Sequence, residues 1–381
     1  MAKILVVGDA GSPLIRARGL IERAAGHEIS FVSPRDASVP GARVFALPQR
    51  IARTRVVRPL GMSFLVDHVI RRVRPDVIHV HYAYQAFATV PLIRFHPLIV
   101  SVMGGDVLAD QGFRGHRPRL VKLLLDHADA ITSKSAFLDA ALADIGNYGR
   151  KLHRVTWGID LDHFNPSRDT AALRRRLRID ATDLVFFDPR LAEPLYNKHV
   201  ILHAFARYLE IGPPAVLVVS ELGGSTEYLA ALRRTAAELG IAQRVRFVGV
   251  IDHAEMADFY ALAAVTISIP SSDGFPQTMY EAAASGSFLI VGDLPQYGEA
   301  LRDGLMALSV RVAEADDLAK ALLWVVQHPD ARTEAVKAGR DFVARAADKT
   351  AEERAVLRIY DDLLAAAACQ ATSRRGMELL H

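Results

Sequence analysis

The chain has 381 residues, 51% of them hydrophobic, and a formal net charge of +3. This length favours two domains, and Cys369, the single cysteine, excludes an internal disulfide and a cysteine-based zinc site. The N-terminal run does not resemble a signal peptide, and no apolar run reaches the ~18 to 20 residues of a spanning helix, so we expect a soluble, cytoplasmic protein.

The charge is distributed unevenly. Residues 1–150 hold 20 Lys and Arg against 12 Asp and Glu, a net +8, whereas residues 151–381 hold 26 against 31, a net −5. A basic first half suits anionic lipid, a phosphorylated substrate or nucleic acid, although scattered arginines are also ordinary in a sequence rich in Ala and Arg. The basic residues show no RNP-like or helix-turn-helix setting, so we do not expect a nucleic-acid partner.

In the first half, short β-branched runs alternate with helical periodicity, which is typical of parallel α/β proteins. A helix is predicted at residues 14–25, ended by Gly26. Strands are predicted at residues 3–7, 29–32, 77–81, 98–102 and 130–132. Residues 155–166, VTWGIDLDHFNP, contain a turn and a proline and are predicted to be a linker.

The alternation then restarts, which predicts a second βα domain of similar size and a cleft between the two as the expected site. Its helix at residues 225–238 ends before Gly240, and a final helix is predicted at 352–368, with 372–381 frayed. Its strands are predicted at residues 184–187, 216–219, 245–250, 265–269 and 288–291.

Residues 270–286, PSSDGFPQTMYEAAASG, join a predicted strand to a helix. Pro276 suits the first helical turn, and Gly274 lets the backbone turn sharply before it. The free amides of Gln277 and Thr278 then point out of the helix N-terminus, where they can bind phosphate oxygens.

Two carboxylates, Asp273 and Glu281, flank this patch of donors. Acceptor-only side chains on either side of a phosphate site suit a ligand with hydroxyl groups at both ends, such as a sugar nucleotide. The alternative is an N-cap aspartate followed by a solvated helix glutamate, which is a common arrangement.

The run SDGFPQTMYEAAASG, followed by DLPQYGEALRDG, resembles the signature of family 4 glycosyltransferases, which have the GT-B fold. The resemblance extends from residue 3 to about residue 367 and is weakest between 35 and 72. It implies an α/β protein of two Rossmann-like parallel-sheet domains facing a cleft. By this resemblance residues 1–160, with a crossing helix at 350–368, bind the acceptor, and residues 168–349 bind the nucleotide-sugar donor.

The resemblance also implies roles for the two acids. Glu281 takes the place of the glutamate that binds the ribose hydroxyls of the donor. Asp273 takes the place of an acid, often glutamate in the family, that binds the transferred sugar. The remaining donor-site residues that it implies are Gly274, Phe275, Gln277 and Thr278.

The segment DPRLAEPLYNKHVILHAF resembles the stretch that carries an Arg and Lys pair in this family. By this match, Arg190 and Lys198 clamp the donor diphosphate. Fixed cations stabilise a leaving diphosphate as it gains charge, without a metal. The alternative is a surface arginine and a helix N-terminal lysine.

Three segments of the first half resemble cleft segments of the family. Near the N-terminus, the Gly11 and Ser12 amides face the donor phosphate or the acceptor; the glycine spacing does not fit GxGxxG. In DVIHVHYAY, His79 and His81 share one face of a strand, and His81 contacts the acceptor or reacting sugar, or is a packed strand-end histidine.

The segment SVMGGDV resembles the Gly-Ser-Asp turn of the family. The resemblance implies that Gly104, Gly105 and Asp106 line the cleft. Met103 stands where many relatives have a histidine that contacts the donor sugar, so that role is not transferred to this chain.

Neither a metal nor a cofactor is expected. Asp160 and Asp162 form a DxD, but the linker match explains them, and no His, Asp and Glu cluster has metal-ligand spacing. The basic stretch at residues 43–60, RVFALPQRIARTRVVRPL, is interpreted either as contact with an anionic membrane or as a solvated loop with scattered arginines.

The resemblance thus implies a retaining, metal-independent glycosyltransferase. It moves a sugar from a nucleotide-sugar, most readily a UDP-sugar, to a glycan or lipid-linked acceptor in cell-envelope polysaccharide or glycolipid synthesis. The alternatives are a GT-B sugar-nucleotide epimerase or hydrolase, and a noncatalytic sugar-nucleotide-binding scaffold.

Overall fold

The computed structural model describes residues 1–52, 54, 57–83, 88–108, 117–273, 277–298 and 307–378. The chain divides into two compact units. Unit 1 combines Met1–Trp157 with the segment from Thr350 onward, and unit 2 is Gly158–Lys349. The sequence placed the first boundary within residues 160–168, and the observed division falls slightly earlier, after Trp157.

Unit 1 is built on a seven-stranded sheet in the order β3-β2-β1-β4-β5-β6-β7, in which every pairing is parallel. The order reverses between β1 and β4, as in the Rossmann arrangement. The strands are β1 (Lys3–Val7), β2 (Glu28–Ser33), β3 (Arg43–Ala46), β4 (Val77–His81), β5 (Leu98–Ser101), β6 (Ala130–Ser133) and β7 (Leu152–Arg154).

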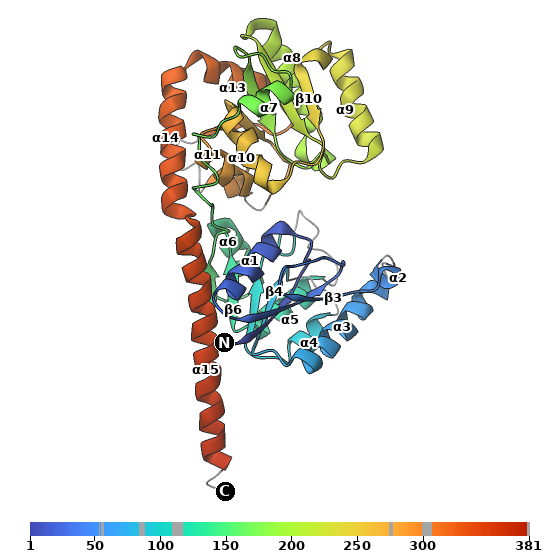
Figure 1. Ribbon diagram of the computed structural model, residues 1–381, viewed down its shortest axis with the longest axis vertical. Coiled ribbons are helices and arrows are strands. Elements are labelled where there is room, and N and C mark those ends of the chain that lie inside the picture. The colour runs from blue at the N-terminus through green and yellow to red at the C-terminus, as the bar shows by residue number, and fades with distance from the viewer. Residues whose placement is uncertain are drawn as a thin grey trace. The chain divides into compact units, whose positions relative to one another are not determined.

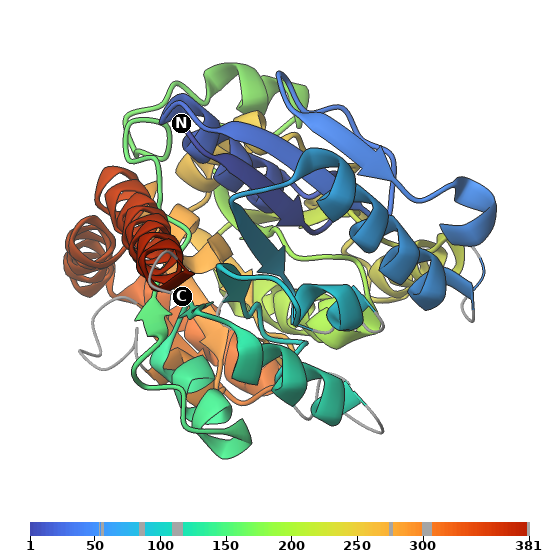
Figure 2. The ribbon, with the colours of Figure 1, turned by 90° about the horizontal axis from the view of Figure 1, so that it is seen from below.

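Helices cover both faces of this sheet (Figures 1 and 2). Because side chains alternate along a strand, Leu5 and Val7 join a core with α3, α5 and α6, whereas Ile4 and Val6 join one with α1 and α15. The helices are α1 (Pro13–Ala24), α2 (Gln49–Ala52), α3 (Val57–Val73), α4 (Thr89–Leu92), α5 (Arg117–His127), α6 (Ala136–Ile145) and α15 (Lys349–Glu378).

Two expectations for unit 1 are wrong. The basic stretch at residues 43–60 is not a solvated loop, because most of its described residues form β3, α2 and the start of α3. The C-terminal segment does not fray at residue 372, because α15 continues to Glu378. The predicted packing of this helix on the first domain is confirmed, since Val356, Ile359 and Tyr360 are buried in its core.

A chain of buried polar groups fastens α15 within unit 1. The Tyr360 hydroxyl lies 2.5 Å from His79 Nδ1 and donates to Glu22 Oε1 of α1. On its other side, His79 Nε2 lies 2.7 Å from the hydroxyl of Ser101. Burial raises the pKa of Glu22 to about 7 and lowers that of His79 to about 3, so His79 is neutral at neutral pH and Glu22 is protonated in about half of the molecules.

Unit 2 has a six-stranded parallel sheet in the order β10-β9-β8-β11-β12-β13, which reverses between β8 and β11. Its strands are β8 (Leu184–Asp188), β9 (Ala215–Ser220), β10 (Val245–Val248), β11 (Val265–Ser268), β12 (Phe288–Gly292) and β13 (Ala307–Val310). Its helices are α7 (Ala171–Arg176), α8 (Lys198–Ile211), α9 (Thr226–Glu238), α10 (His253–Leu262), α11 (Gln277–Ala284), α13 (Ala315–Gln327) and α14 (Pro329–Ala346).

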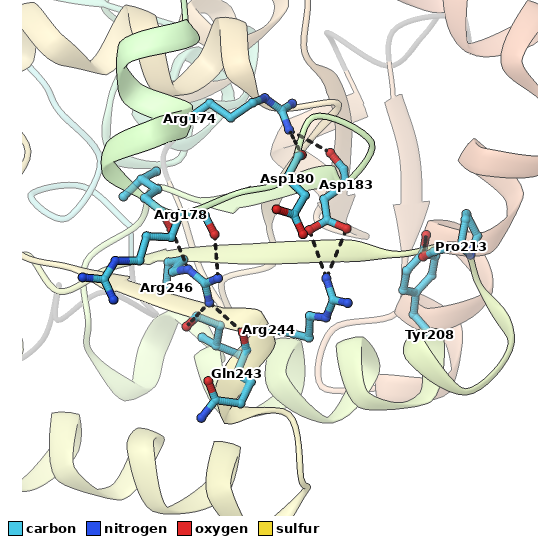
Figure 3. Close-up of polar contacts among 11 residues, drawn as sticks. Arg174, Arg178, Asp180, Asp183, Tyr208, Pro213, Gln243, Arg244 and Arg246 are labelled. Atoms are coloured by element: carbon cyan, nitrogen blue, oxygen red, sulfur yellow. Dashed lines mark hydrogen bonds and ion pairs between the residues drawn. The ribbon is translucent and has the colours of Figure 1, made fainter.

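Arginines tie the segment before β8 to β10 (Figure 3). Arg246 donates to the carbonyls of Leu177 and Arg178, at 2.7 and 3.0 Å. Arg244 Nη1 lies 3.0 and 3.1 Å from the two carboxylate oxygens of Asp183. These arginines therefore hold the fold of unit 2 together.

The two ends of unit 2 lie side by side. Ile159 pairs with Asp348 in an isolated parallel bridge, and the Ile159 amide donates to the Ala347 carbonyl at 2.7 Å. An ion pair of 3.1 Å between Lys349 and Asp160 adds to this junction.

Candidate nucleotide-sugar site

The candidate site of unit 2 lies at the carboxyl ends of β8 and β11, where the strand order reverses and where ligands bind in open α/β sheets. Asn197 joins the loops that follow these two strands. Its side-chain nitrogen donates to the Ile269 carbonyl at 2.9 Å and to the Ser271 hydroxyl at 3.0 Å. Asn197 itself has φ = 53° and ψ = 34°, a left-handed conformation that asparagine tolerates well.

Arg190 and Asp273 meet across these two loops. Arg190 Nη2 lies 2.6 Å from Asp273 Oδ2, and both side chains are about nine-tenths buried. The Tyr297 hydroxyl donates to the same oxygen at 3.1 Å, and Gln296 donates to the Asp273 backbone carbonyl at 2.5 Å. Asp273 is therefore held in place from two directions.

The guanidinium of Arg190 remains charged despite its burial. Burial alone lowers its pKa, but the Asp273 carboxylate, together with Tyr297 and Tyr196, outweighs this effect and raises the pKa above its usual value. The ring of Tyr196 lies 4.7 Å from Arg190 Cζ, in cation–π contact. Among the described residues, Arg190 Nη1 is buried and has no hydrogen-bond partner, which leaves a charged donor for an anionic ligand.

Lys198 lies at the start of α8 but is only 1% exposed. Its ammonium is 2.7 Å from Asp188 Oδ2, while Asp188 Oδ1 accepts from the Arg190 amide at 3.2 Å. Burial lowers the pKa of Lys198, and the Asp188 carboxylate opposes that effect. In this structure, Lys198 therefore braces the loop that carries Arg190.

Glu281, on the second turn of α11, is 7% exposed and bound at both oxygens. The Tyr260 hydroxyl donates to Oε2 at 3.1 Å, and His253 Nε2 lies 3.4 Å from Oε1. Both partners come from α10, seven residues apart and therefore on one face of that helix. The predicted alternative, a solvated helix glutamate, is wrong.

The amide cluster before Glu281 is described only in part. Gln277 and Thr278 form the half-buried first residues of α11, and Gln277 Nε2 donates to the Gly158 carbonyl at 3.3 Å. Gly274 and Phe275, predicted in the same group, lie outside the described residues together with Pro276.

In unit 1, His81 is fully buried at the end of β4, with its ring 4.1 Å from that of His79 and 5.7 Å from that of Trp157. Burial holds its pKa well below the ordinary value, so the ring is neutral. In this structure it is a packed strand-end histidine, which is the alternative that the sequence left open.

Asp106 organises the predicted glycine turn. Its buried carboxylate accepts from the amides of Ala83 and Gly104, both at 2.8 Å, and from that of Met103 at 3.0 Å. Gly104 has φ = 128°, a backbone angle that residues with a side chain rarely adopt, and Gly105 is half-buried. Asp106 thus ties two loops at the carboxyl ends of β4 and β5 together.

The N-terminal loop of unit 1 is fastened by Asp9. The Gly11 amide donates to Asp9 Oδ1 at 3.0 Å, and the Ser12 amide to the Asp9 carbonyl at 2.9 Å. Both amides that the sequence assigned to a ligand are therefore engaged within their own loop. The Ser12 side chain occupies the N-cap position of α1 without making a capping hydrogen bond.

Within the ranges that the structure describes, no group of three or more His, Cys, Asp and Glu side chains is arranged to hold a metal ion. None of the helices in those ranges combines the length and apolar composition needed to cross a bilayer.

Several site residues were not singled out from the sequence: Asp188, Asn197, His253, Tyr260, Gln296 and Tyr297. Three of them carried a usable signal. Asp188 directly follows the predicted strand at residues 184–187, two residues before Arg190, and Gln296 and Tyr297 belong to the quoted segment DLPQYGEALRDG. The other contacts join positions far apart in the chain.

Comparison with solved structures supports this architecture. The chain is similar to sucrose-phosphate synthase from Thermosynechococcus elongatus, with a TM-score of 0.82, 20% identity and coverage of 96% of this chain and 100% of that chain. It is also similar to the Anabaena protein HepE in complex with UDP-glucose, with a TM-score of 0.80, 16% identity and coverage of 95% and 100%. The fold is that of a GT-B glycosyltransferase.

Sequence comparison gives the family. The model "Glycosyl transferases group 1" matches residues 169–342, and the model "Glycosyltransferase Family 4" matches residues 17–163. The chain is 29% identical to a D-inositol 3-phosphate glycosyltransferase of Frankia alni, over 77% of this chain and 75% of the relative. Three further relatives carry the same name, and the chain spans less than two thirds of the length of each. The chain belongs to the family 4 glycosyltransferases, as its motifs indicated, and it is a glycosyltransferase.

Proposed function

We propose that this enzyme transfers a sugar from a nucleoside-diphosphate sugar, most readily a UDP-sugar, to a glycan or lipid-linked acceptor, without a metal and with retention of anomeric configuration. The observation that carries the proposal is Arg190, a buried cation with one terminal nitrogen on Asp273 and the other without a partner among the described residues. A fixed cation of this kind stabilises the charge that develops on a leaving diphosphate.

The other roles follow from the chemistry of the side chains. Glu281, bound by Tyr260 and His253, retains lone pairs on both oxygens for the ribose hydroxyls. Asp273 accepts a hydroxyl of the transferred sugar. In the proposed retaining reaction the leaving phosphate takes the acceptor proton on the same face, so no side chain has to serve as a nucleophile.

The choice of donor and acceptor rests on relatives and neighbours. HepE was solved with UDP-glucose, which supports UDP-sugars as the first donors to test. Several relatives are named D-inositol 3-phosphate glycosyltransferase, so D-inositol 3-phosphate belongs in the acceptor screen beside glycans and lipid-linked sugars. A role in envelope polysaccharide or glycolipid synthesis is part of the proposal.

The first test is thermal stability of the protein with UDP, GDP, ADP, dTDP or NAD, each with and without magnesium. We expect a metal-independent rise in Tm with one nucleoside diphosphate. Glu281→Ala should abolish this rise, because the ribose hydroxyls lose their acceptor, and Glu210→Ala, at an exposed position of α8, should retain it. A rise with NAD alone would contradict the proposal.

Product analysis separates the enzymatic alternatives. A transferase forms glycosylated product only when acceptor is present, whereas an epimerase or hydrolase changes the sugar nucleotide without acceptor. A scaffold binds the nucleotide-sugar and changes it under neither condition.

We also propose that unit 1 contacts anionic lipid through α3. This helix exposes Val57, Leu60 and Phe64, with Phe64 77% exposed, on positions spaced three and four residues apart. Exposed arginines, Arg58 and Arg72, lie at its two ends. Apolar side chains flanked by arginines suit the interfacial region of an anionic bilayer.

Vesicle flotation tests this surface. We expect the protein to float with phosphatidylglycerol vesicles at low salt and less at high salt, because screening weakens the contribution of the arginines. Phe64→Glu should reduce flotation several-fold, while Val90→Glu, at an exposed position of α4, should not. Equal recovery with neutral phosphatidylcholine vesicles, or none with either, would remove the membrane contact.

A further inference from the structure

One ionisable group beside the candidate ribose site has no role in the function proposed so far. His253 is the first residue of α10, and its side chain is 58% exposed, whereas the side chain of its neighbour Glu281 is only 9% exposed. The imidazole Nε2 lies 3.4 Å from Glu281 Oε1. A half-exposed histidine thus lies between solvent and an almost fully buried carboxylate.

The geometry of α10 gives this contact a defined orientation. Tyr260 is fully buried and lies seven residues further along the same face of α10, and its hydroxyl donates to the other oxygen of Glu281 at 3.1 Å. The ring of Phe164 packs edge-on against His253, with centroids 5.7 Å apart, and also lies 6.2 Å from the ring of Tyr260. Aromatic packing therefore supports both groups that hold the carboxylate.

The charged surroundings favour a protonated imidazole. Its contact with Glu281 raises the pKa of His253 above the ordinary value, which burial only partly opposes. Two acidic residues lie next to it: Asp252 is the N-cap residue of α10, and Glu255, in the first turn, is paired with Arg176 of α7. The preceding segment contributes His163 and Arg168, of which Arg168 pairs with Asp258.

We infer that His253 is a positioning residue for nucleotide recognition: it orients the Glu281 carboxylate toward the ribose hydroxyls, and it makes the affinity for the donor nucleotide depend on pH. This inference rests on the proposed role of Glu281. Protonated His253 donates a charge-assisted hydrogen bond that fixes one oxygen, while Tyr260 fixes the other. A carboxylate held at both oxygens presents its remaining lone pairs in one orientation, so less ordering is needed on binding.

The direction of the pH dependence follows from the raised pKa. A histidine whose pKa is raised by a partner contributes its interaction below that pKa and loses it as the pH rises through it. The affinity for ribose-containing nucleotides should therefore be higher at pH 6.5 than at pH 9. Because the pair is partly exposed, its effect should be at most about fivefold, equivalent to the ~1 kcal/mol of an exposed ion pair.

The test compares Kd values of UDP and 2′-deoxy-UDP, or of another nucleoside diphosphate that the protein prefers with its 2′-deoxy counterpart. His253→Ala should reduce the preference for the ribonucleotide about fivefold at pH 6.5 and hardly at pH 9. His253→Gln, which keeps a neutral donor, should preserve part of the preference and make it independent of pH. His203→Ala, at an exposed position of α8, should behave as wild type.

When variants are compared at the same pH, the effect of phosphate ionisation on the Kd is the same for each variant and cancels. A role for His253 only in folding would weaken both nucleotides equally, and that result overturns the inference. The inference is also overturned if Glu281→Ala abolishes the preference for the ribonucleotide but His253→Ala leaves it intact. In that case the proposed function survives. If the wild-type protein binds no nucleoside diphosphate, the proposed function fails and the inference fails with it.

Discussion

Replacing Arg190 with alanine is expected to lower kcat/KM for sugar transfer by about a thousandfold. Loss of one fixed charge-stabilising donor typically costs 10²- to 10³-fold in kcat, and binding of the donor diphosphate should weaken as well. The substitution also leaves Asp273, 11% exposed, without its cation. Steady-state kinetics with the donor identified by thermal shift, together with the Kd of the corresponding diphosphate, give the two contributions separately.

Two further variants show whether this effect belongs to the site. Arg190→Lys keeps the charge but cannot bind Asp273 and a phosphate at once through two terminal nitrogens, so we expect only partial recovery. Arg207→Ala removes an arginine from an exposed ion pair with Asp316 in the same unit and should leave kinetics unchanged. An Arg190→Ala enzyme that is folded and retains more than a tenth of wild-type kcat/KM would contradict the proposed role.

Tyr360→Phe is expected to destabilise unit 1 by about 2–4 kcal/mol. The lost hydroxyl bonds both His79 and Glu22, which are 2% and 0% exposed, and each buried polar group left without a partner costs roughly 1–3 kcal/mol. To measure this change, Tyr360→Phe is introduced into a Trp324→Phe variant, which is then unfolded in urea. Trp157 is the only remaining tryptophan, so tryptophan fluorescence reports on unit 1.

The matched control is Tyr208→Phe. Tyr208 is equally buried but donates only to the Pro213 carbonyl at 3.0 Å (Figure 3), in unit 2. We expect this substitution to leave the Trp157 transition where it is. Equal shifts of that transition in the two variants would show that loss of a buried hydroxyl, rather than the polar chain of unit 1, accounts for the result.

The order of strands and helices was largely predictable because each strand is a short apolar run bounded by turn residues. The strands that escaped prediction lie at sheet edges: β3 and β7 are short and partly exposed, and β13 follows residues outside the described ranges. An edge strand is paired on one side only, so it needs fewer apolar residues than a central strand. The helix α3 was not predicted, because its first residues belong to the arginine-rich stretch at residues 43–60, which was interpreted as a membrane contact or a loop.

The site was predictable to the extent that its residues share a local motif. Asp273, Glu281 and Arg190 were identified from short segments, and the structure places Arg190 against Asp273. The contacts that hold these side chains were not readable from the sequence. Tyr297 meets Asp273 across 24 positions, and His253 meets Glu281 across 28, only when separate loops and helices pack together. Lys198 shows the limit of a motif: its position was anticipated, but its burial against Asp188 was not. The roles assigned to individual site residues stay predictions.

The polar chain around Tyr360 also bears on how the protein is made. Unit 2 is one continuous segment, whereas unit 1 needs Tyr360, which lies 281 positions after its partner His79 and 338 positions after its partner Glu22. Of the two units, unit 1 is therefore begun first on the ribosome and completed last. Until α15 emerges, the face formed by Ile4 and Val6 lacks part of its cover, so a chain that lacks α15 should be recognised by chaperones and proteases through a defect in unit 1.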